Sequence, residues 1–144
     1  MFGEALAEYL EWTPAALDDE IERLELASRG LDARRYAARA AAESRQTPAL
    51  DGHRSTQAYL RATCNQPSHV ARAEVRRARI CRDFPRIGEA LIAARIGVGQ
   101  IDELVRITRN ERAAKYLDDA AVDMLLEHAE HLPIRTLRLL STAG

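Results

Sequence analysis

The stretch best suited to chemistry is DGHRSTQAYL, residues 51–60, where a histidine and a serine stand two positions apart. A nucleophilic serine needs a base within hydrogen-bonding reach, and that base needs a third group to orient it. No acidic residue is placed to orient His53, whereas Ser55 can cap a helix by accepting a backbone N–H. We therefore interpret the stretch as a turn at Asp51-Gly52 followed by a helix start, and expect no catalytic residue. Contact of His53 or Arg54 with a ligand stays open.

Metal binding is the second chemistry that the residue types suggest. His128 and His131 are three apart, so a helix would place both on one face, and Cys64, His69 and Cys81 could converge in space. The spacings CxxC, HxxxH and HExxH do not occur, and a structural zinc ion takes four ligands. We expect neither a metal nor another cofactor.

An arginine stripe is the strongest candidate for binding. Arg72, Arg76 and Arg79 follow an i, i+4, i+7 spacing on a helix that is otherwise largely apolar. Such a stripe could lie along a phosphate backbone. It could equally be solvated or pair with an acidic stripe farther up the chain. That acidic stripe consists of Asp18, Glu22 and Glu25. The isoelectric point of about 6.4 is low for a strong nucleic-acid binder, so DNA contact is a hypothesis only.

Residues 86–107, RIGEALIAARIGVGQIDELVRI, resemble a helix-turn-helix. Ala93 and Gly97 match the small residue and the turn glycine of repressor-type motifs. The position six after that glycine, which should be apolar, is Glu103. The register is off by one, so we expect two helices joined by a tight turn but no recognition helix.

Composition and periodicity predict one all-α domain over residues 1–144. Helix signals recur, and no segment alternates apolar with polar residues as a strand does. The net charge is −1, but residues 51–112 hold twelve basic and seven acidic side chains between acidic ends. No run approaches the ~20 apolar residues of a membrane span, and the acidic start is not a signal peptide. We expect a cytoplasmic protein with Cys64 and Cys81 reduced and buried.

Seven or eight helices are expected, of which the second is the longest. The ranges are 3–12, 14–45, 55–64, 68–84, 86–95, 98–109, 118 or 119 to 131, and a last helix from Pro133. Thr13, Ser55 and Ser68 are the expected N-caps, and Pro14 and Pro85 open helices. About 32 residues would make the second helix ~48 Å long. Because this exceeds the size of a compact domain, the helix must kink at Gly30 or project towards a partner.

The long helix carries a seam that could pair with another helix. The seam consists of Leu17, Ile21, Leu24 and Leu31, with Ser28 between the last two. This 4-3-4-3 spacing is typical of helix–helix packing. It predicts either burial inside the domain or a homodimer.

The order of motifs over residues 14–141 resembles the domain of unknown function 222, an actinobacterial helical domain. The matching elements are the Asp51-Gly52-His53-x-Ser55 turn, Tyr59-Leu60, the arginine-rich helix Ala71–Ile80 and the link Ile96–Gln100. Tyr59 stands where tryptophan is usual, Ala94 replaces the link glycine, and Gly97 replaces a capping serine. In that family the helical domain usually precedes an HNH endonuclease domain, and this chain contains no HNH motif.

The resemblance implies a non-catalytic accessory module of an HNH endonuclease-like protein, and fold analogy alone does not establish its role. We expect it to assist DNA binding or positioning through Arg72, Arg76 and Arg79. The alternative is an oligomerisation or protein-interaction module that uses the long N-terminal helix. We expect no membrane partner and infer no small-molecule ligand from the sequence.

Overall fold

The computed structural model describes residues 1–45, 52 and 55–131. Over these ranges the chain forms eight helices and no strand, which confirms the predicted all-α fold with a long N-terminal helix. None of the described helices is both long enough and apolar enough to cross a membrane. The helix expected after Pro133 lies outside the described residues. The helices are α1 (Phe2–Leu10), α2 (Pro14–Ser44), α4 (Thr56–Thr63), α5 (Ser68–Asp83), α6 (Pro85–Ile92), α7 (Val98–Arg109), α8 (Glu111–Ala114) and α9 (Asp119–His131).

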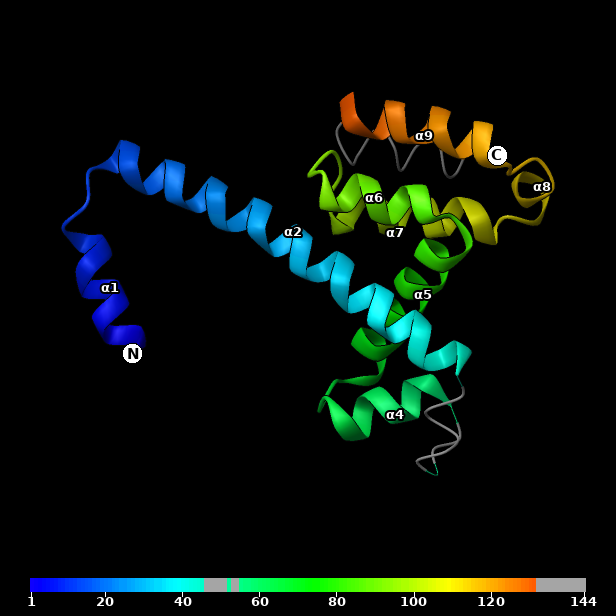
Figure 1. Cartoon of the computed structure of the whole chain (residues 1–144), viewed down its shortest axis with the longest axis horizontal. Coiled ribbons are helices and arrows are strands. Elements are labelled where there is room, and N and C mark those ends of the chain that lie inside the picture. Colours follow the sequence, from blue (N-terminus) through cyan, green and yellow to red (C-terminus); the bar gives the residue numbers. More distant parts are fainter. Residues whose placement is uncertain (46–51, 53–54, 132–144) are drawn as a thin grey trace.

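The helices from α4 onward and the C-terminal part of α2 form a compact body (Figure 1). In it, α2 packs against α5 and α6, α5 against α4 and α7, and α6 against α9. The main core lies between these helices, and a smaller cluster of Leu60, Ala71 and Val75 lies between α4 and α5. The largest fully buried side chains of the main core include Tyr36, Ile87, Leu91, Ile96 and Ile101.

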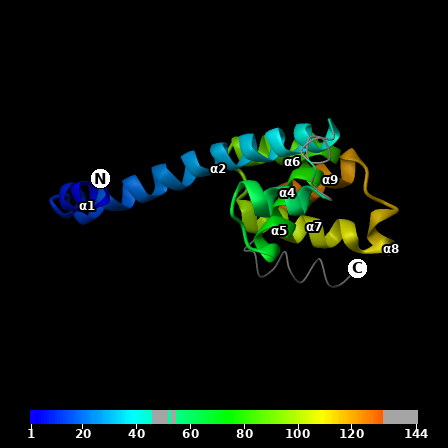
Figure 2. The ribbon, with the colours of Figure 1, turned by 90° about the horizontal axis from the view of Figure 1, so that it is seen from below.

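The first half of α2 leaves the body. The helix runs unbroken through Gly30 over 31 residues, which corresponds to a length of ~46 Å. Its buried residues are Ala33, Tyr36 and Ala40, all in the second half. Residues 14–28 and the whole of α1 contribute no buried residue and stand clear of the other helices in both views (Figures 1 and 2). We call α1 together with residues 11–28 the arm.

Local capping chemistry explains most helix starts. The hydroxyl of Thr13 accepts from the backbone N–H of Ala16, and that of Ser55 accepts from Ala58, as predicted. The expected Ser68 cap is wrong, because α5 already begins at Ser68 and its N-cap residue is Pro67, without a side-chain bond.

The link between α6 and α7 is tight and carries backbone strain. Helix α6 ends at Ile92, three residues earlier than predicted, and Ala94 takes a left-handed conformation with φ of 59°. An L-residue pays roughly 1–2 kcal/mol for this conformation. Gly97 then starts α7, where the side chain of Gln100 accepts from its backbone N–H at 2.9 Å. This bond satisfies the backbone N–H of Gly97, which itself has no side chain to cap the helix.

Candidate functional site

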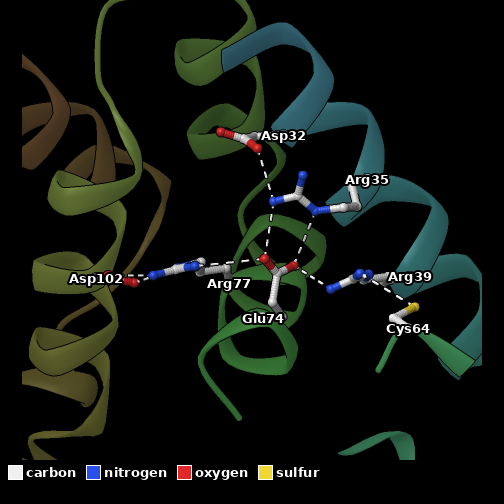
Figure 3. Close-up of polar contacts among 7 residues, drawn as sticks. All are labelled: Asp32, Arg35, Arg39, Cys64, Glu74, Arg77 and Asp102. Carbon is white, nitrogen blue, oxygen red and sulfur yellow. Dashed lines mark hydrogen bonds and ion pairs between the residues drawn. The ribbon is translucent and has the colours of Figure 1, made fainter. Parts of the chain in front are cut away.

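A buried carboxylate holds three helices of the body together (Figure 3). Glu74 on α5 is only 4% exposed and pairs with Arg35 and Arg39 of α2. Arg77, one turn farther along α5, lies 3.8 Å from Glu74 and donates two bonds, of 2.7 and 2.8 Å, to Asp102 of α7. The ion pairs therefore join α2, α5 and α7 at one point.

This network is balanced in charge. It contains three guanidinium groups and three carboxylates, the third being Asp32, which lies 2.9 Å from Arg35. The bond to Asp102 is the main reason that the pKa of Arg77 is raised above its usual value. Since every carboxylate is already held by a guanidinium, the network has no free charge to offer a ligand, and its role is to fix the helices.

Sequence reasoning missed Glu74, although a signal was present. The buried positions of α5 include Ala71, Glu74, Val75 and Ala78, the spacing of a single helix face. A lone acid at a core position of an arginine-rich helix indicates a buried ion pair, because a buried charge needs a partner.

The seam that the sequence predicted is largely exposed, on the arm and, at Leu31, just beyond it. Ile21, Leu24 and Leu31 are 65%, 45% and 69% exposed, and Leu17 is partly covered. On α1, Phe2, Leu6 and Leu10 repeat at a spacing of four residues and are exposed too. The structure therefore leaves most of these large apolar side chains of α1 and α2 exposed, and of the two alternatives for the long helix it shows the projecting one rather than a kink at Gly30.

The arginine stripe of α5 divides into two parts. Arg79 is bound by Glu43 of α2, and this pairing, with the bond as its main cause, holds the pKa of Glu43 below its usual value. The partner is thus Glu43 near the end of α2, and not the acidic stripe considered from the sequence. Among the described residues, no carboxylate pairs with Arg72 or Arg76.

A second helix supplies the neighbour of Arg76. The pKa of the Arg76 guanidinium is lowered below its usual value. The main cause is burial, followed by repulsion from Arg109 of α7 and from Arg72. Arg76 and Arg109 both line two adjacent cavities, of about 380 Å³ and about 300 Å³, between α5 and α7. We call Arg72, Arg76 and Arg109 the cationic cluster. Arg109 was not a candidate from the sequence, since nothing there brings α7 beside α5.

The remaining predicted candidates do not converge on a site. His53, Arg54 and Asp51 lie outside the described residues, so the ligand contact left open for them stays a prediction. Cys64 is exposed at the end of α4, which corrects its expected burial, while burial raises the pKa of Cys81 to about 11. Within the described ranges, no three histidine, cysteine or acidic side chains gather as metal ligands.

Comparison with known proteins gives no family for this chain. No family model matches it, and neither a curated protein nor a solved structure does. The resemblance to the domain of unknown function 222 therefore stays a prediction.

Proposed function

We propose that this chain is an assembly module whose arm pairs with the arm of a second copy. The observation that carries the proposal is the exposed seam on a helix that stands clear of its own body. Full burial of one leucine or isoleucine side chain contributes roughly 1.5–3 kcal/mol. Pairing would cover at least Ile21, Leu24 and Leu31 in each copy, and contiguous exposed apolar surface of this kind marks interaction sites.

The spacing of the seam permits an antiparallel pair. Reversal about Leu24 places Leu17 opposite Leu31 of the other copy and Leu24 opposite its own equivalent, while Ile21 faces Ala27. The same patch then serves both partners, as a two-fold dimer requires. An antiparallel pair also places the two bodies at opposite ends of the paired arms.

Charge supports the same direction. Residues 14–25 carry five acids and one arginine, whereas residues 26–34 carry two arginines and one acid. Parallel arms would set one acidic segment against the other, and like charges in that position repel. Antiparallel arms set the acidic segment against the more basic one.

Sedimentation at micromolar concentration tests the pairing. We expect a dimer for the unmodified chain and a monomer for Ile21→Glu/Leu24→Glu, because both changes put a charge into the covered seam. The matched control is Met124→Glu on α9, whose side chain is 58% exposed and lies away from the arm. Loss of the dimer in the control, or a monomer for the unmodified chain, would refute the proposal.

Cysteine cross-linking tests the direction. In a Cys64→Ser background, a mixture of Leu17→Cys and Leu31→Cys chains should form a mixed disulfide-linked dimer. Leu17→Cys alone should not cross-link, since residues 17 of the two copies lie far apart in an antiparallel pair. Cys81 should stay inert, because the thiolate is the reactive form and its pKa is about 11. Efficient 17–17 linkage would show parallel arms instead.

DNA positioning, the role expected from the family resemblance, is the second candidate. Arg72 and Arg76 favour it because no described carboxylate pairs with them, whereas Arg79 is already held by Glu43. In a salt titration of duplex binding, Arg72→Ala and Arg76→Ala should each reduce the slope of log affinity against log salt concentration by roughly one unit. Absence of binding at low salt would remove this candidate.

A further inference from the structure

We propose that the groove between α5 and α7 binds the phosphate group of a nucleotide, with Arg76 and Arg109 as the phosphate ligands and Arg72 beside them. The inference does not rest on self-association, since it uses other helices and other residues. The proposed site combines the arginine stripe with Arg109 of α7 and with a cavity that can receive the rest of a phosphate ester.

The first argument is that Arg76 differs from the other partly buried arginines of the body. Arg39 and Arg77 are each paired with a carboxylate, and so is the more exposed Arg35. Arg76 is partly buried too, yet its neighbouring charges are Arg72 and Arg109, both cations. Cations gathered without an acid repel one another, and a bound anion relieves that repulsion.

The second argument is that the nearby acids are already paired with other arginines. Asp83, on the rim of the larger cavity, is bound by Arg82 at 3.0 Å. Asp102, on the rim of the smaller cavity, is held by two bonds from Arg77. Glu43 is bound by Arg79, the remaining arginine at the larger cavity. The surplus charge at the groove is therefore positive and belongs to the cationic cluster.

The third argument is the shape and lining of the larger cavity. Its volume of about 380 Å³ lies within the range of small-molecule sites. Apolar side chains share the lining with the arginines, and Gln57 and Thr108 add polar groups. The apolar members are Val75, Ile80, Phe84 and Val105. A hollow with a mixed polar and apolar lining and guanidinium groups at its edge suits a ligand with a planar organic part and a phosphate.

The chemistry of the side chains suits an oxyanion such as phosphate. The guanidinium group presents a planar fork of donors that matches phosphate oxygens and stays charged at any physiological pH. Aromatic side chains such as Phe84 can stack on a nucleobase irrespective of its identity. A free nucleotide and a nucleotide within a single strand share these features, so the site accepts the chemistry of both and the experiment separates the two sources.

Calorimetry on the full chain at low salt provides the test, with adenosine monophosphate, adenosine, inorganic phosphate and a short single-stranded oligonucleotide as probes. We expect adenosine monophosphate or the oligonucleotide to bind at least tenfold more tightly than adenosine. Arg76→Gln and Arg109→Gln should each weaken that binding on the order of tenfold, as loss of a charged hydrogen bond does. Arg34→Gln removes the same charge from an exposed position of α2 and should change it less than twofold.

The two sources give different patterns, and both support the site. Equal affinity for the mononucleotide and the oligonucleotide identifies a free nucleotide, whereas binding of the oligonucleotide alone identifies a strand. Thermal unfolding of each variant provides the folding control, and Arg76→Gln should be at least as stable as the unmodified chain because it removes repulsion. If no phosphorylated probe prefers the unmodified chain over Arg76→Gln/Arg109→Gln, or if adenosine binds as well as its phosphate, the proposal is wrong.

Discussion

Replacing Glu74 by glutamine should weaken the body more than any single exposed charge can. The substitution keeps the shape of the side chain and one acceptor oxygen but removes the charge. Arg77 keeps Asp102 and Arg35 keeps Asp32, so both retain an acid. Arg39, whose side chain is 13% exposed, loses its carboxylate partner in the described chain and keeps only a 3.9 Å contact with the sulfur of Cys64.

The expected loss in the free energy of unfolding follows from these lost and retained ion pairs. Breaking a buried ion pair by removing one partner costs about 3–5 kcal/mol. The retained amide oxygen and the partial exposure of Arg35 reduce this, and we expect a loss of about 2–4 kcal/mol in the free energy of unfolding. With a typical urea dependence, the midpoint of unfolding would fall by about 1–2 M.

Urea unfolding followed by far-ultraviolet circular dichroism measures this change. The tryptophan of the chain, Trp12, lies on the arm, so its fluorescence would not report on the body. All variants should be compared at one protein concentration, since self-association adds to apparent stability. The control is Asp83→Asn, an exposed acid paired with its neighbour Arg82, which should cost less than about 0.5 kcal/mol.

A double-mutant cycle then asks whether Arg39 is the reason. Removing both charges in Glu74→Gln/Arg39→Gln should cost less than the sum of the two single changes, with a coupling of about 1–3 kcal/mol. If Glu74→Gln is no more damaging than Asp83→Asn, or if the cycle shows no coupling, Glu74 does not join the helices as we argue.

Two further predictions concern the joints of the body. The pKa of Glu43 is lowered by Arg79 below its usual value of 4.5, so the pair contributes full stability above that pH and loses it as the pH falls through the lower, folded value. Glu43→Gln should therefore show a smaller drop in urea midpoint than the unmodified chain between about pH 5 and pH 3, and an identical drop would contradict the pairing. Ala94→Gly should raise the unfolding free energy by about 0.5–1 kcal/mol, because relief of the left-handed strain exceeds the added chain entropy. An unchanged or lowered thermal midpoint would show that Ala94 is not strained.

Many of the helix boundaries were predictable because their signals are local. Thr13-Pro14 and Ser55 begin helices through bonds made within one turn, and these bonds form whatever surrounds them. The short helix α8 was not predicted, although Asn110 caps it by accepting from Arg112 at 3.0 Å. The seam on α2 was also visible, since helical periodicity alone determines which side chains share a face.

The sequence by itself determined the all-α class, the long second helix and the row of apolar side chains along it, because capping, propensity and periodicity act over a few residues. Only the tertiary structure decided what those side chains meet. It left Ile21 and Leu24 in solvent, gave Glu43 to Arg79, and set Arg109 of α7 beside Arg76 of α5. Charge and apolar patterns specify what a side chain requires, but the packing of helices distant in sequence determines which partner satisfies it.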